Sequence, residues 1–487
     1  MSGACATLSS VTEALPRSAG GAAAPALSAT ELAGLTGGRL LRTSGRSIRG
    51  GAVDSRLVEP GNLFVALPGE RTDGHRFLAA AVAAGASALV VSQQQATSEL
   101  DTLGDVTVIL VRDGLTALGA IAAGWRRRFN PLVVGVTGSI AKTSTKEAAA
   151  AVLGRRFRTL RSEGNQNNEI GLPLTLLRLT PEDEAAVLEM GMYVGGEIAD
   201  LAAMAQPRIG VVTAVQPVHL SRIGTLEAVE QAKGELVEAL PADGTAILNA
   251  DDPRVLRMAD RTAARILTYG LSEAADVGAD QVTSAGTNGM RFALRLPGGV
   301  RRDAVTPALG RHGVHNGLAA AAVGQAAGCT PEEIVAGLSD GWSAPHRDSL
   351  IRAGEVTILD DSYNASPGSV LAALDLLATL PAVRRVAVLG EMLELGDAHE
   401  AGHREVGRAA AGVAELLVVV GDGAAALADA ALEAGLPADR VLRAPDAGAA
   451  LDCLRPRLRS GDAVLVKASR GIALDGLVAR MVAEFQG

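Results

Sequence analysis

The sequence predicts an α/β protein of three domains built largely on parallel sheets. At roughly 150 residues per domain, its 487 residues correspond to about three domains. Short apolar runs alternate along the chain with stretches rich in helix formers, which is typical of strand–helix units in parallel sheets. Hydrophobic residues make up 48% of the chain but aromatic residues only 2%, so we expect aliphatic cores.

Charge and cysteine content exclude several functional classes. The net charge of −9 gives no basic surface for nucleic acid. The three cysteines are scattered without metal or redox spacing, which indicates a reducing compartment. No apolar run reaches the ~18 residues of a membrane span, and the first 25 residues lack the apolar segment of a signal peptide. We therefore expect a cytoplasmic monomer that binds neither nucleic acid nor membranes, with a disordered tail over 1–25.

The first domain is expected over residues 26–118. A strand is predicted at 62–67, because an apolar run lies there between two Pro-Gly turns. Further strands are predicted at 88–92 and 106–111, with a helix of small residues at 77–84. This alternation favours a small α/β domain.

The second domain, residues 119–343, opens on the stretch LVVGVTGSIAKTSTKE, which begins at Leu132. A valine-rich strand, a glycine turn, a Lys-Thr pair and an alanine-rich helix follow one another in the order of a phosphate-binding loop. In such a loop the backbone N–H groups face the anion, the lysine adds positive charge and a hydroxyl can hold magnesium. Val136 and Ala141 stand where the strict pattern has glycine, so an ordinary strand–turn–helix is the alternative. If the loop needs a positive φ at Ala141, alanine costs about 1 kcal/mol there.

Polar residues follow other expected strands of this domain. Glu189 ends the apolar run 185–189, so its carboxylate should point into the crevice where parallel sheets bind ligands. His219 follows the run 210–213, although a lone histidine is more often a structural hydrogen-bonding residue.

Three further features of the second domain suit ligand binding. Three asparagines between residues 165 and 168 suit either a ligand-binding loop or a solvated turn. Lys233 lies on the predicted helix 227–240, where a lysine is ordinarily exposed to solvent. Asn316 lies near the start of another predicted helix, at 313–325.

The third domain is expected over residues 344–487. Its strands, separated by helical segments, are predicted at 357–359, 386–389, 416–420 and 463–466. This pattern is typical of a doubly wound, Rossmann-like sheet. A hinge is expected at the junction, near Arg347.

Six stretches, in order along the chain, resemble the Mur ligase family, most closely its member that adds D-alanyl-D-alanine. They read DSRLVEPGNLFVALPGERTDGHRF from Asp54, GNQNNEIGLPLTLL from Gly164, LEMGMYVGGEI from Leu188, DDSYNASPGSVLAAL from Asp360, LGEMLELGDAHEAGH from Leu389 and VLVKASRG from Val464. The resemblance covers nearly the whole chain after the tail. It implies an N-terminal domain that binds a UDP precursor, a central P-loop ATPase domain and a Rossmann-like C-terminal domain.

The resemblance also implies an activity, which is ATP-dependent joining of D-alanyl-D-alanine to UDP-N-acetylmuramoyl-tripeptide in peptidoglycan precursor synthesis. A carboxylate condenses with an amine only after activation, here as an acyl phosphate, and that step requires ATP and Mg2+. Two alternatives stay open. The protein could be another ATP-dependent amino-acid ligase of the same superfamily, or a nucleotide-binding protein that Ala141 has left without ligase activity.

Residue roles follow from the same resemblance. Catalysis is implied for Lys142, Glu189, His219 and Lys233. ATP would be held by Gly138, Ser139, Ile140, Ala141, Lys142, Thr143, Ser144, Asn316, Arg347 and Asp361. The precursor and the dipeptide would be contacted by Ser55, Arg56, Asn62, Asp73, Gly74, His75, Asn165, Asn167, Asn168, Asn364, Lys467, Ser469 and Arg470. Magnesium would be held by Thr143, Glu189, His219 and Lys233, the last as a carbamate.

Overall fold

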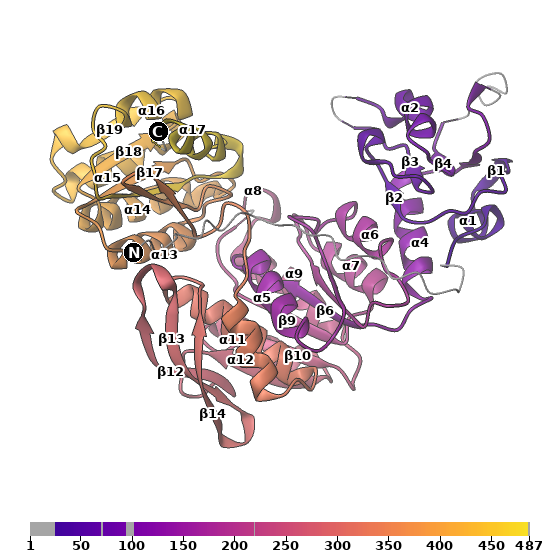
Figure 1. The fold of residues 1–487 in the computed structure, drawn as a ribbon, viewed down its shortest axis with the longest axis horizontal. Helices are drawn as coiled ribbons and strands as arrows, with labels where there is room; N and C mark the ends of the chain where they lie inside the picture. Colours follow the sequence, from indigo (N-terminus) through magenta and orange to yellow (C-terminus); the bar gives the residue numbers. More distant parts are fainter. Residues whose placement is uncertain (1–24, 70–71, 94–101, 219, 486–487) are drawn as a thin grey trace, which may run out of the picture.

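Three β-sheets follow one another along the chain, each with helices packed against it (Figure 1). The computed structural model describes residues 25–69, 72–93, 102–218 and 220–485. The disordered tail predicted over 1–25 therefore lies outside the described residues, apart from Pro25.

The first sheet has five strands in the order β1-β5-β4-β3-β2. Its strands are β1 Arg39–Arg42, β2 Gly51–Ala52, β3 Leu63–Val65, β4 Ala88–Val91 and β5 Thr107–Leu110. All neighbours are parallel except β1, which runs antiparallel to β5. The accompanying helices are α1 Ala29–Thr36, α2 Leu78–Ala83 and α4 Gly114–Arg126.

The central sheet has nine strands in the order β14-β13-β12-β11-β10-β9-β6-β8-β7. They are β6 Leu132–Thr137, β7 Thr159–Arg161, β8 Ala185–Glu189, β9 Ile209–Val212, β10 Thr245–Asn249, β11 Arg265–Gly270, β12 Val277–Ser284, β13 Met290–Leu296 and β14 Val300–Thr306. Its helices are α5 Lys142–Leu153, α6 Gly171–Leu176, α7 Glu197–Ala205, α8 Leu220–Ile223, α9 Leu226–Glu238, α10 Pro253–Leu256, α11 Gly310–Ala326 and α12 Pro331–Asp340.

One end of the central sheet differs from the parallel sheet that the sequence predicts. Strands β12, β13 and β14 pair antiparallel with one another. The segments that join them are only the short turns around 285–289 and 297–299, and a parallel connection needs a crossover of a dozen or more residues. The central sheet is therefore mixed, with its parallel part running from β7 to β12.

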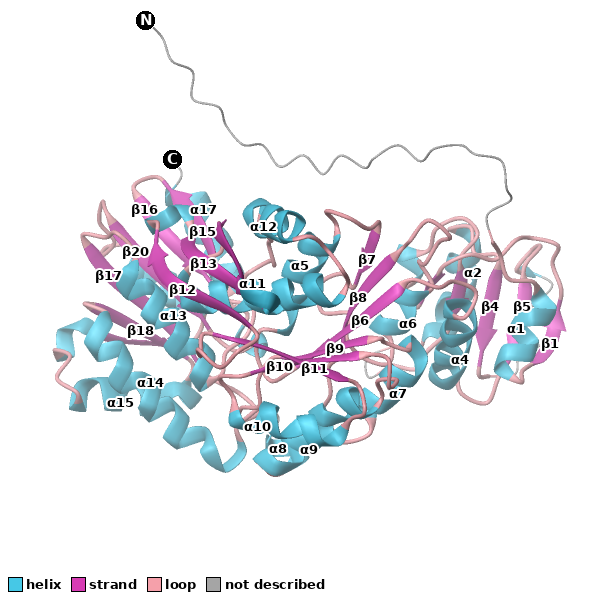
Figure 2. Ribbon diagram, turned by 90° about the horizontal axis from the view of Figure 1, so that it is seen from below, coloured by secondary structure: helices cyan, strands magenta, loops and turns pink. Residues whose placement is uncertain are grey.

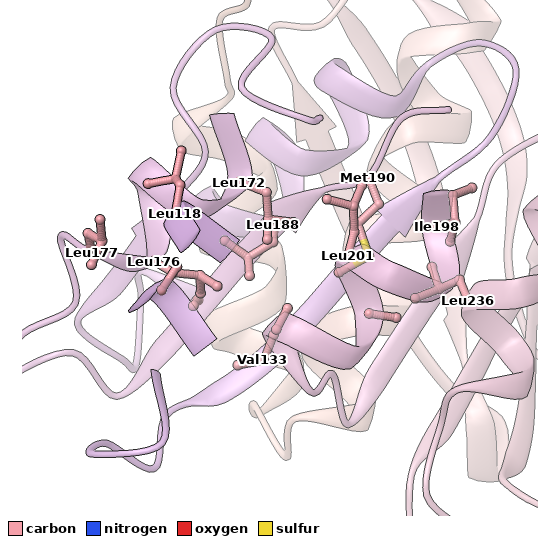
Figure 3. Packing of buried hydrophobic residues seen from close by; sticks show 14 of the residues in the cluster. Leu118, Val133, Leu172, Leu176, Leu177, Leu188, Met190, Ile198, Leu201 and Leu236 are labelled. Atoms are coloured by element: carbon pink, nitrogen blue, oxygen red, sulfur yellow. The ribbon is translucent and has the colours of Figure 1, made fainter. Parts of the chain in front are cut away.

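Successive residues of the central strands enter two different cores, because side chains alternate across a strand. Val133 and Leu188 pack with α6, α7 and α9 on one face, as Figure 3 shows. Val134 and Val187 pack with α5, α11 and α12 on the other face. The first of these cores continues through α4 into the five-stranded sheet, where it includes Leu63. The domain limits given above stay a prediction.

The third sheet is doubly wound. Its strands, in the order β15-β16-β20-β17-β18-β19, are β15 Ser349–Ala353, β16 Val356–Asp360, β17 Arg384–Gly390, β18 Leu416–Val420, β19 Val441–Ala444 and β20 Asp462–Lys467. Only β15 is antiparallel to its neighbour. One face carries α13 Pro367–Thr379, α14 His399–Val413 and α15 Ala425–Glu433, and the other carries α16 Ala447–Leu454 and α17 Asp475–Phe485. Figure 2 shows α14 and α15 on the side of the sheet opposite α17.

The three-domain α/β architecture and the doubly wound third sheet agree with the fold class that the sequence predicts. Among the described residues, none of the helices combines the length and the apolar character needed to span a bilayer.

The core between β8 and its covering helices should contribute strongly to stability. Leu188 is fully buried there, so Leu188→Ala should lower the free energy of unfolding of the central region by about 3 kcal/mol. Leu57, which is 72% exposed, offers a matched control, and Leu57→Ala should change stability by less than about 0.5 kcal/mol. Urea denaturation of both variants checks this, and equal losses would contradict it.

Candidate functional site

The loop between β6 and α5 is tied to the neighbouring strand β9. Gly138 has φ of 146°, and a Cβ atom there would lie 1.8 Å from Oγ1 of Thr213, so only glycine fits. The Ser139 amide donates to the carbonyl of Ala214 at 2.8 Å. The Thr213 hydroxyl donates to the carbonyl of Ile140 at 2.6 Å. The backbone path from Gly138 into the helix N-terminus is thus held in place before any ligand arrives.

Ala141 occupies the position where α5 begins. Its φ of 65° and ψ of 0° are left-handed, and its carbonyl accepts the first helical hydrogen bond, from Thr145, at 2.9 Å. The loop therefore does need a positive φ at Ala141, which was the condition for an energetic cost of alanine there. Relative to glycine, alanine costs about 1 kcal/mol in this conformation.

Lys142 folds back over the loop. Its Nζ donates to the carbonyl of Gly138 at 2.7 Å and to that of Ser139 at 3.3 Å. Burial lowers the pKa of the Lys142 ammonium; Glu189 opposes this effect and Arg347 reinforces it. Lys142, Glu189 and Arg347 therefore share one electrostatic site. A phosphate at the start of α5 would give the ammonium a charged partner that the loop carbonyls do not provide.

Glu189 ends β8 inside this site. Its side chain is 1% exposed, and its Oε1 accepts from Nδ2 of Asn167 at 2.8 Å. Its Oε2 is buried and has no hydrogen-bond partner among the described residues. A desolvated carboxylate oxygen without a partner is costly unless a cation completes it. This oxygen therefore fits a metal ion.

The available oxygen donors suit a magnesium ion that substrate phosphates help to bind, and do not form a complete metal site made of protein groups alone. Within the described ranges, no three His, Cys, Asp or Glu side chains converge to hold a metal. Mg2+ is usually bound through one or two carboxylates together with substrate phosphates and water. Glu189, with the buried Thr143 hydroxyl at the start of α5, offers such a sparse set. His219 lies outside the described residues.

Lys233 on α9 is buried rather than solvated, with 2% of its surface exposed. In the part of the chain that the structure describes, its amine makes no hydrogen bond or ion pair. Burial and the nearby Lys142 ammonium lower its pKa well below the usual lysine value. Burial therefore disfavours the charged form of this amine. The alternative of an ordinary surface lysine does not hold.

The third domain contributes two cations that contact the same tyrosine ring. The guanidinium of Arg347 lies 4.2 Å from the ring centroid of Tyr363, and that of Arg470 lies 5.2 Å from it. Cation–π contacts of this kind hold both arginines in defined directions. Sequence reasoning missed Tyr363, although it is the one aromatic residue in the stretch that begins at Asp360.

Arg347 lies in a constrained junction between the second and third domains. Its neighbours His346 and Asp348 both have left-handed backbones, with φ of 58° and 47°. His346 Nδ1 lies 2.8 Å from Oδ2 of Asp360, and His312 Nε2, from α11, lies 3.1 Å from Oδ2 of Asp348. The hinge expected near Arg347 stays a prediction, and the sequence gave no sign of these partners, which come from distant segments.

Behind Arg347, a buried ion pair joins the ends of two strands. Lys467, at the end of β20, pairs with Asp361 and also donates to the carbonyl of Asn364 at 2.9 Å. Burial raises the pKa of Asp361 to about 6, although Lys467 opposes the shift. The Ser469 hydroxyl accepts from the Leu393 amide at 2.8 Å. These residues form the carboxyl edge of the third sheet.

Asn316 lies on α11 against the helix that follows the loop. It is 6% exposed, and its Oδ1 accepts from the Thr145 hydroxyl at 3.4 Å. Its neighbour His315 lies 3.1 Å from Oδ1 of Asn249 and 3.2 Å from Oδ2 of Asp251. This polar cluster adjoins the same strand edge as the loop.

The asparagines of the second motif have different surroundings. Asn167 contacts Glu189, as described above. Asn168 Oδ1 accepts from the Gly171 amide at 2.9 Å, at the first residue of α6. The Asn165 carbonyl accepts from the Asn167 amide at 2.7 Å, and Asn165 is exposed. The loop is therefore partly structural.

The predicted residues of the first domain form a separate group, far from the loop in Figure 1. Asn62 donates to the Arg49 carbonyl at 3.0 Å, and Asp73 contacts His75 at 2.6 Å. Gly74 packs against the backbone of Leu67, where no Cβ would fit. Ser55 begins a short 3-10 turn that Asp54 caps, and the Arg56 side chain is 86% exposed.

A phosphate-binding loop, an adjacent unpartnered carboxylate and a second sheet edge carrying arginines define a nucleotide-binding α/β enzyme with three domains. Comparison with known families agrees with that class. The Mur ligase middle domain matches residues 136–324, the Mur ligase glutamate ligase domain matches 346–470, and the Mur ligase family catalytic domain matches 47–126.

Individual relatives agree with the family match. UDP-N-acetylmuramoyl-tripeptide–D-alanyl-D-alanine ligase of Synechocystis is 38% identical over 88% of this chain and 91% of its own. MurF from Acinetobacter baumannii has a TM-score of 0.83 at 29% identity, covering 94% of this chain and 99% of that one. MurF ligase from Thermotoga maritima, solved in complex with ADP, has a TM-score of 0.78 at 27% identity, covering 90% and 98%. The chain belongs to the Mur ligase family and is a ligase.

The left-handed Ala141 generates a prediction about stability. Ala141→Gly should raise the free energy of unfolding by up to about 1 kcal/mol, because glycine adopts this backbone without the Cβ conflict. Ala148, in the middle of the same helix, is the matched control, and Ala148→Gly should lower stability by about 1 kcal/mol. Denaturation curves of the two variants test the difference in sign. Two losses of equal size would show that the loop does not strain Ala141.

Proposed function

We propose that the protein joins D-alanyl-D-alanine to UDP-N-acetylmuramoyl-tripeptide in a reaction that converts ATP to ADP and phosphate. The observation that carries the proposal is the group formed by the half-buried Lys142 and the buried Glu189 and Lys233 at the phosphate-binding loop of a Mur ligase fold. The match over 88% of this chain to a relative named for this reaction supports the choice of substrates. We further propose that the protein works in the cytoplasm as a monomer.

The reaction needs two steps. The tripeptide carboxylate first takes the γ-phosphoryl group of ATP and becomes an acyl phosphate. The dipeptide amine then attacks the carbonyl carbon, and inorganic phosphate leaves. Phosphoryl transfer depends mainly on positioning and charge neutralisation. Lys142, with the amides from Gly138 to Ser144, would hold the phosphates at the start of α5.

Magnesium would neutralise phosphate charge and bring the carboxylate to the phosphoryl group. In the proposal, the free oxygen of Glu189 and the Thr143 hydroxyl hold one ion, and His219 contributes to a second. Lys233 would act as a carbamate, formed when its neutral amine takes up carbon dioxide and releases a proton. An anion at that position suits magnesium, whereas an ammonium would repel it.

The remaining roles fall to the outer domains. Arg347 would reach the nucleotide phosphates from the hinge, since its charge already acts on Lys142. Asn316 and Asp361 would contact the nucleoside. Lys467, Ser469, Arg470 and the Asn364 region would receive the dipeptide, with Asn165, Asn167 and Asn168 near the precursor. The UDP moiety would occupy the first domain at Ser55, Arg56, Asn62, Asp73, Gly74 and His75. Closure about Arg347 would exclude water from the acyl phosphate.

A phosphate-release assay with the UDP-tripeptide precursor tests the function. The purified chain is given ATP, Mg2+ and either D-alanyl-D-alanine or one of a panel of other amines. Release that depends on D-alanyl-D-alanine is expected. Release only with a different amine would favour another ligase of the superfamily, and no release with any amine would favour a nucleotide-binding protein without ligase activity.

Removal of the loop ammonium should abolish turnover. Lys142→Ala is expected to lower the rate at least about a thousandfold, because nothing else at the start of α5 supplies that charge. Arg440, an exposed cation in the third domain, provides the control, and Arg440→Ala should keep normal activity. The rates come from the same assay, with circular dichroism to check the fold. Substantial ligation by folded Lys142→Ala would rule out the assigned role.

The carbamate proposal makes a separate prediction for Lys233. Lys233→Ala should lose most activity and regain part of it when a small carboxylic acid such as acetate or formate is added, because the acid can occupy the vacated space. Lys233→Arg should remain inactive, since a guanidinium stays charged and is not carbamylated. Near-native turnover by Lys233→Arg in buffer depleted of carbon dioxide would contradict the proposal.

A further inference from the structure

Lys146 is a fully buried lysine that the proposed chemistry does not use. It lies on α5, one turn after Lys142, and its side chain is 0% exposed. Its Nζ donates to the carbonyl of Ser162 at 2.6 Å and to that of Gly164 at 3.2 Å. It also lies 2.8 Å from Oε1 of Glu147. A lysine ammonium has three N–H donors, and here each has an oxygen partner.

Two of these partners open the segment 162–168, which reaches Glu189 by two routes. The Ser162 hydroxyl accepts from the Glu189 amide at 3.2 Å. The Asn167 side chain donates to Oε1 of the Glu189 carboxylate at 2.8 Å. The Asn167 carbonyl also accepts from the amide of Gly191, just beyond β8, at 2.7 Å. The segment is thus fixed to Lys146 at its start and to the end of β8 at the other end.

From this geometry we propose that Lys146 is a positioning residue for the Glu189 carboxylate. By fixing the Ser162 and Gly164 carbonyls, Lys146 sets where Asn167 lies, and Asn167 engages Oε1 so that Oε2 stays free. The inference rests on the magnesium site of the proposed function. Helix α5 then has two tasks. Its N-terminus faces the phosphates, and its second turn sets the carboxylate that must meet the same metal.

The charge at Lys146 favours this role over simple packing. A buried ammonium is costly unless hydrogen bonds and an opposite charge compensate it, whereas an apolar side chain would fill the same space without that cost. Glu147 supplies the opposite charge and is itself shared with Arg161, at 2.7 Å. What an apolar residue could not supply is the directed pair of hydrogen bonds to the loop carbonyls.

Metal affinity of the intact chain provides the test. Lys146→Met keeps the length and volume of the side chain but removes its donors. Mn2+ replaces Mg2+ as the probe, and its binding in the presence of ADP is followed by electron paramagnetic resonance, without turnover. Lys146→Met should weaken Mn2+ binding about tenfold, the usual scale for residues that orient a metal ligand. ADP affinity without metal should change less than about twofold, because the loop and Lys142 are untouched.

Two further variants separate positioning from a general loss of structure. Arg161→Met removes the outer partner of Glu147 but no contact to the loop, so its Mn2+ affinity should match that of the unmodified chain. Asn167→Ala should weaken Mn2+ binding, and the double variant with Lys146→Met should be little weaker than Asn167→Ala alone. Additive losses would mean that Lys146 does not act through Asn167.

The outcome for folded Lys146→Met decides the inference. Unchanged Mn2+ affinity would overturn it while leaving the proposed function intact. Failure of the unmodified chain to bind Mn2+ with ADP would instead contradict the proposed metal site itself.

A second variant keeps the test decisive if Lys146→Met does not fold. Gly164 is exposed with φ of 52° and open space around it, so Gly164→Val would displace its carbonyl from Lys146 without a steric clash in the core. Gly37, with φ of 60° and equal space in the first domain, is its control. Weaker Mn2+ binding by Gly164→Val but not by Gly37→Val is expected, and equal affinities would overturn the inference.

Discussion

The imbalance of buried charge at the carboxyl edge of the central sheet governs the site. Lys142 and Arg347 act as cations on the space around Glu189, whose second oxygen has no protein partner. The protein completes this site only partly, because loop carbonyls are weak partners for an ammonium and burial disfavours the charged form of Lys233. A polyanion with a divalent cation would satisfy both deficits together. The unpartnered carboxylate oxygen of Glu189 calls for a cation, and the positive charges of Lys142 and Arg347 call for an anion.

Patterns local in sequence accounted for most of the fold. Apolar runs of four to six residues such as β6, β8 and β18 are buried on both faces of their sheets, so their positions followed from composition alone. The same logic located Glu189, since the end of such a strand faces a ligand crevice. The antiparallel extension was missed, although buried residues of β13 alternate with exposed or half-buried ones and could have been recognised by their period of two.

The parts of the site that the sequence could not predict are contacts between distant segments. Asn167 donates a hydrogen bond to Glu189, 22 residues further along the chain, and His312 of α11 contacts Asp348, which precedes the third sheet. No spacing rule connects such pairs, because their distance is set by strand order. Ala141 was a different case. The sequence showed that a positive φ there would matter, but the angle itself could be read only from the backbone of the structure. His219 and the tail over 1–24 lie beyond the described residues.

The hydrophobic core that continues from the first sheet into the central domain has a mechanical consequence. Helix α4 belongs to both, since Trp125 donates to the Leu179 carbonyl at 3.1 Å and Arg126 to the Ala205 carbonyl at 3.0 Å. Because one core joins them, we expect the first two sheets to unfold together and the third sheet, which has cores of its own, to unfold separately. Excision of the first sheet would expose a broad apolar surface on each fragment, which makes this pair of domains a poor site for recombination between relatives.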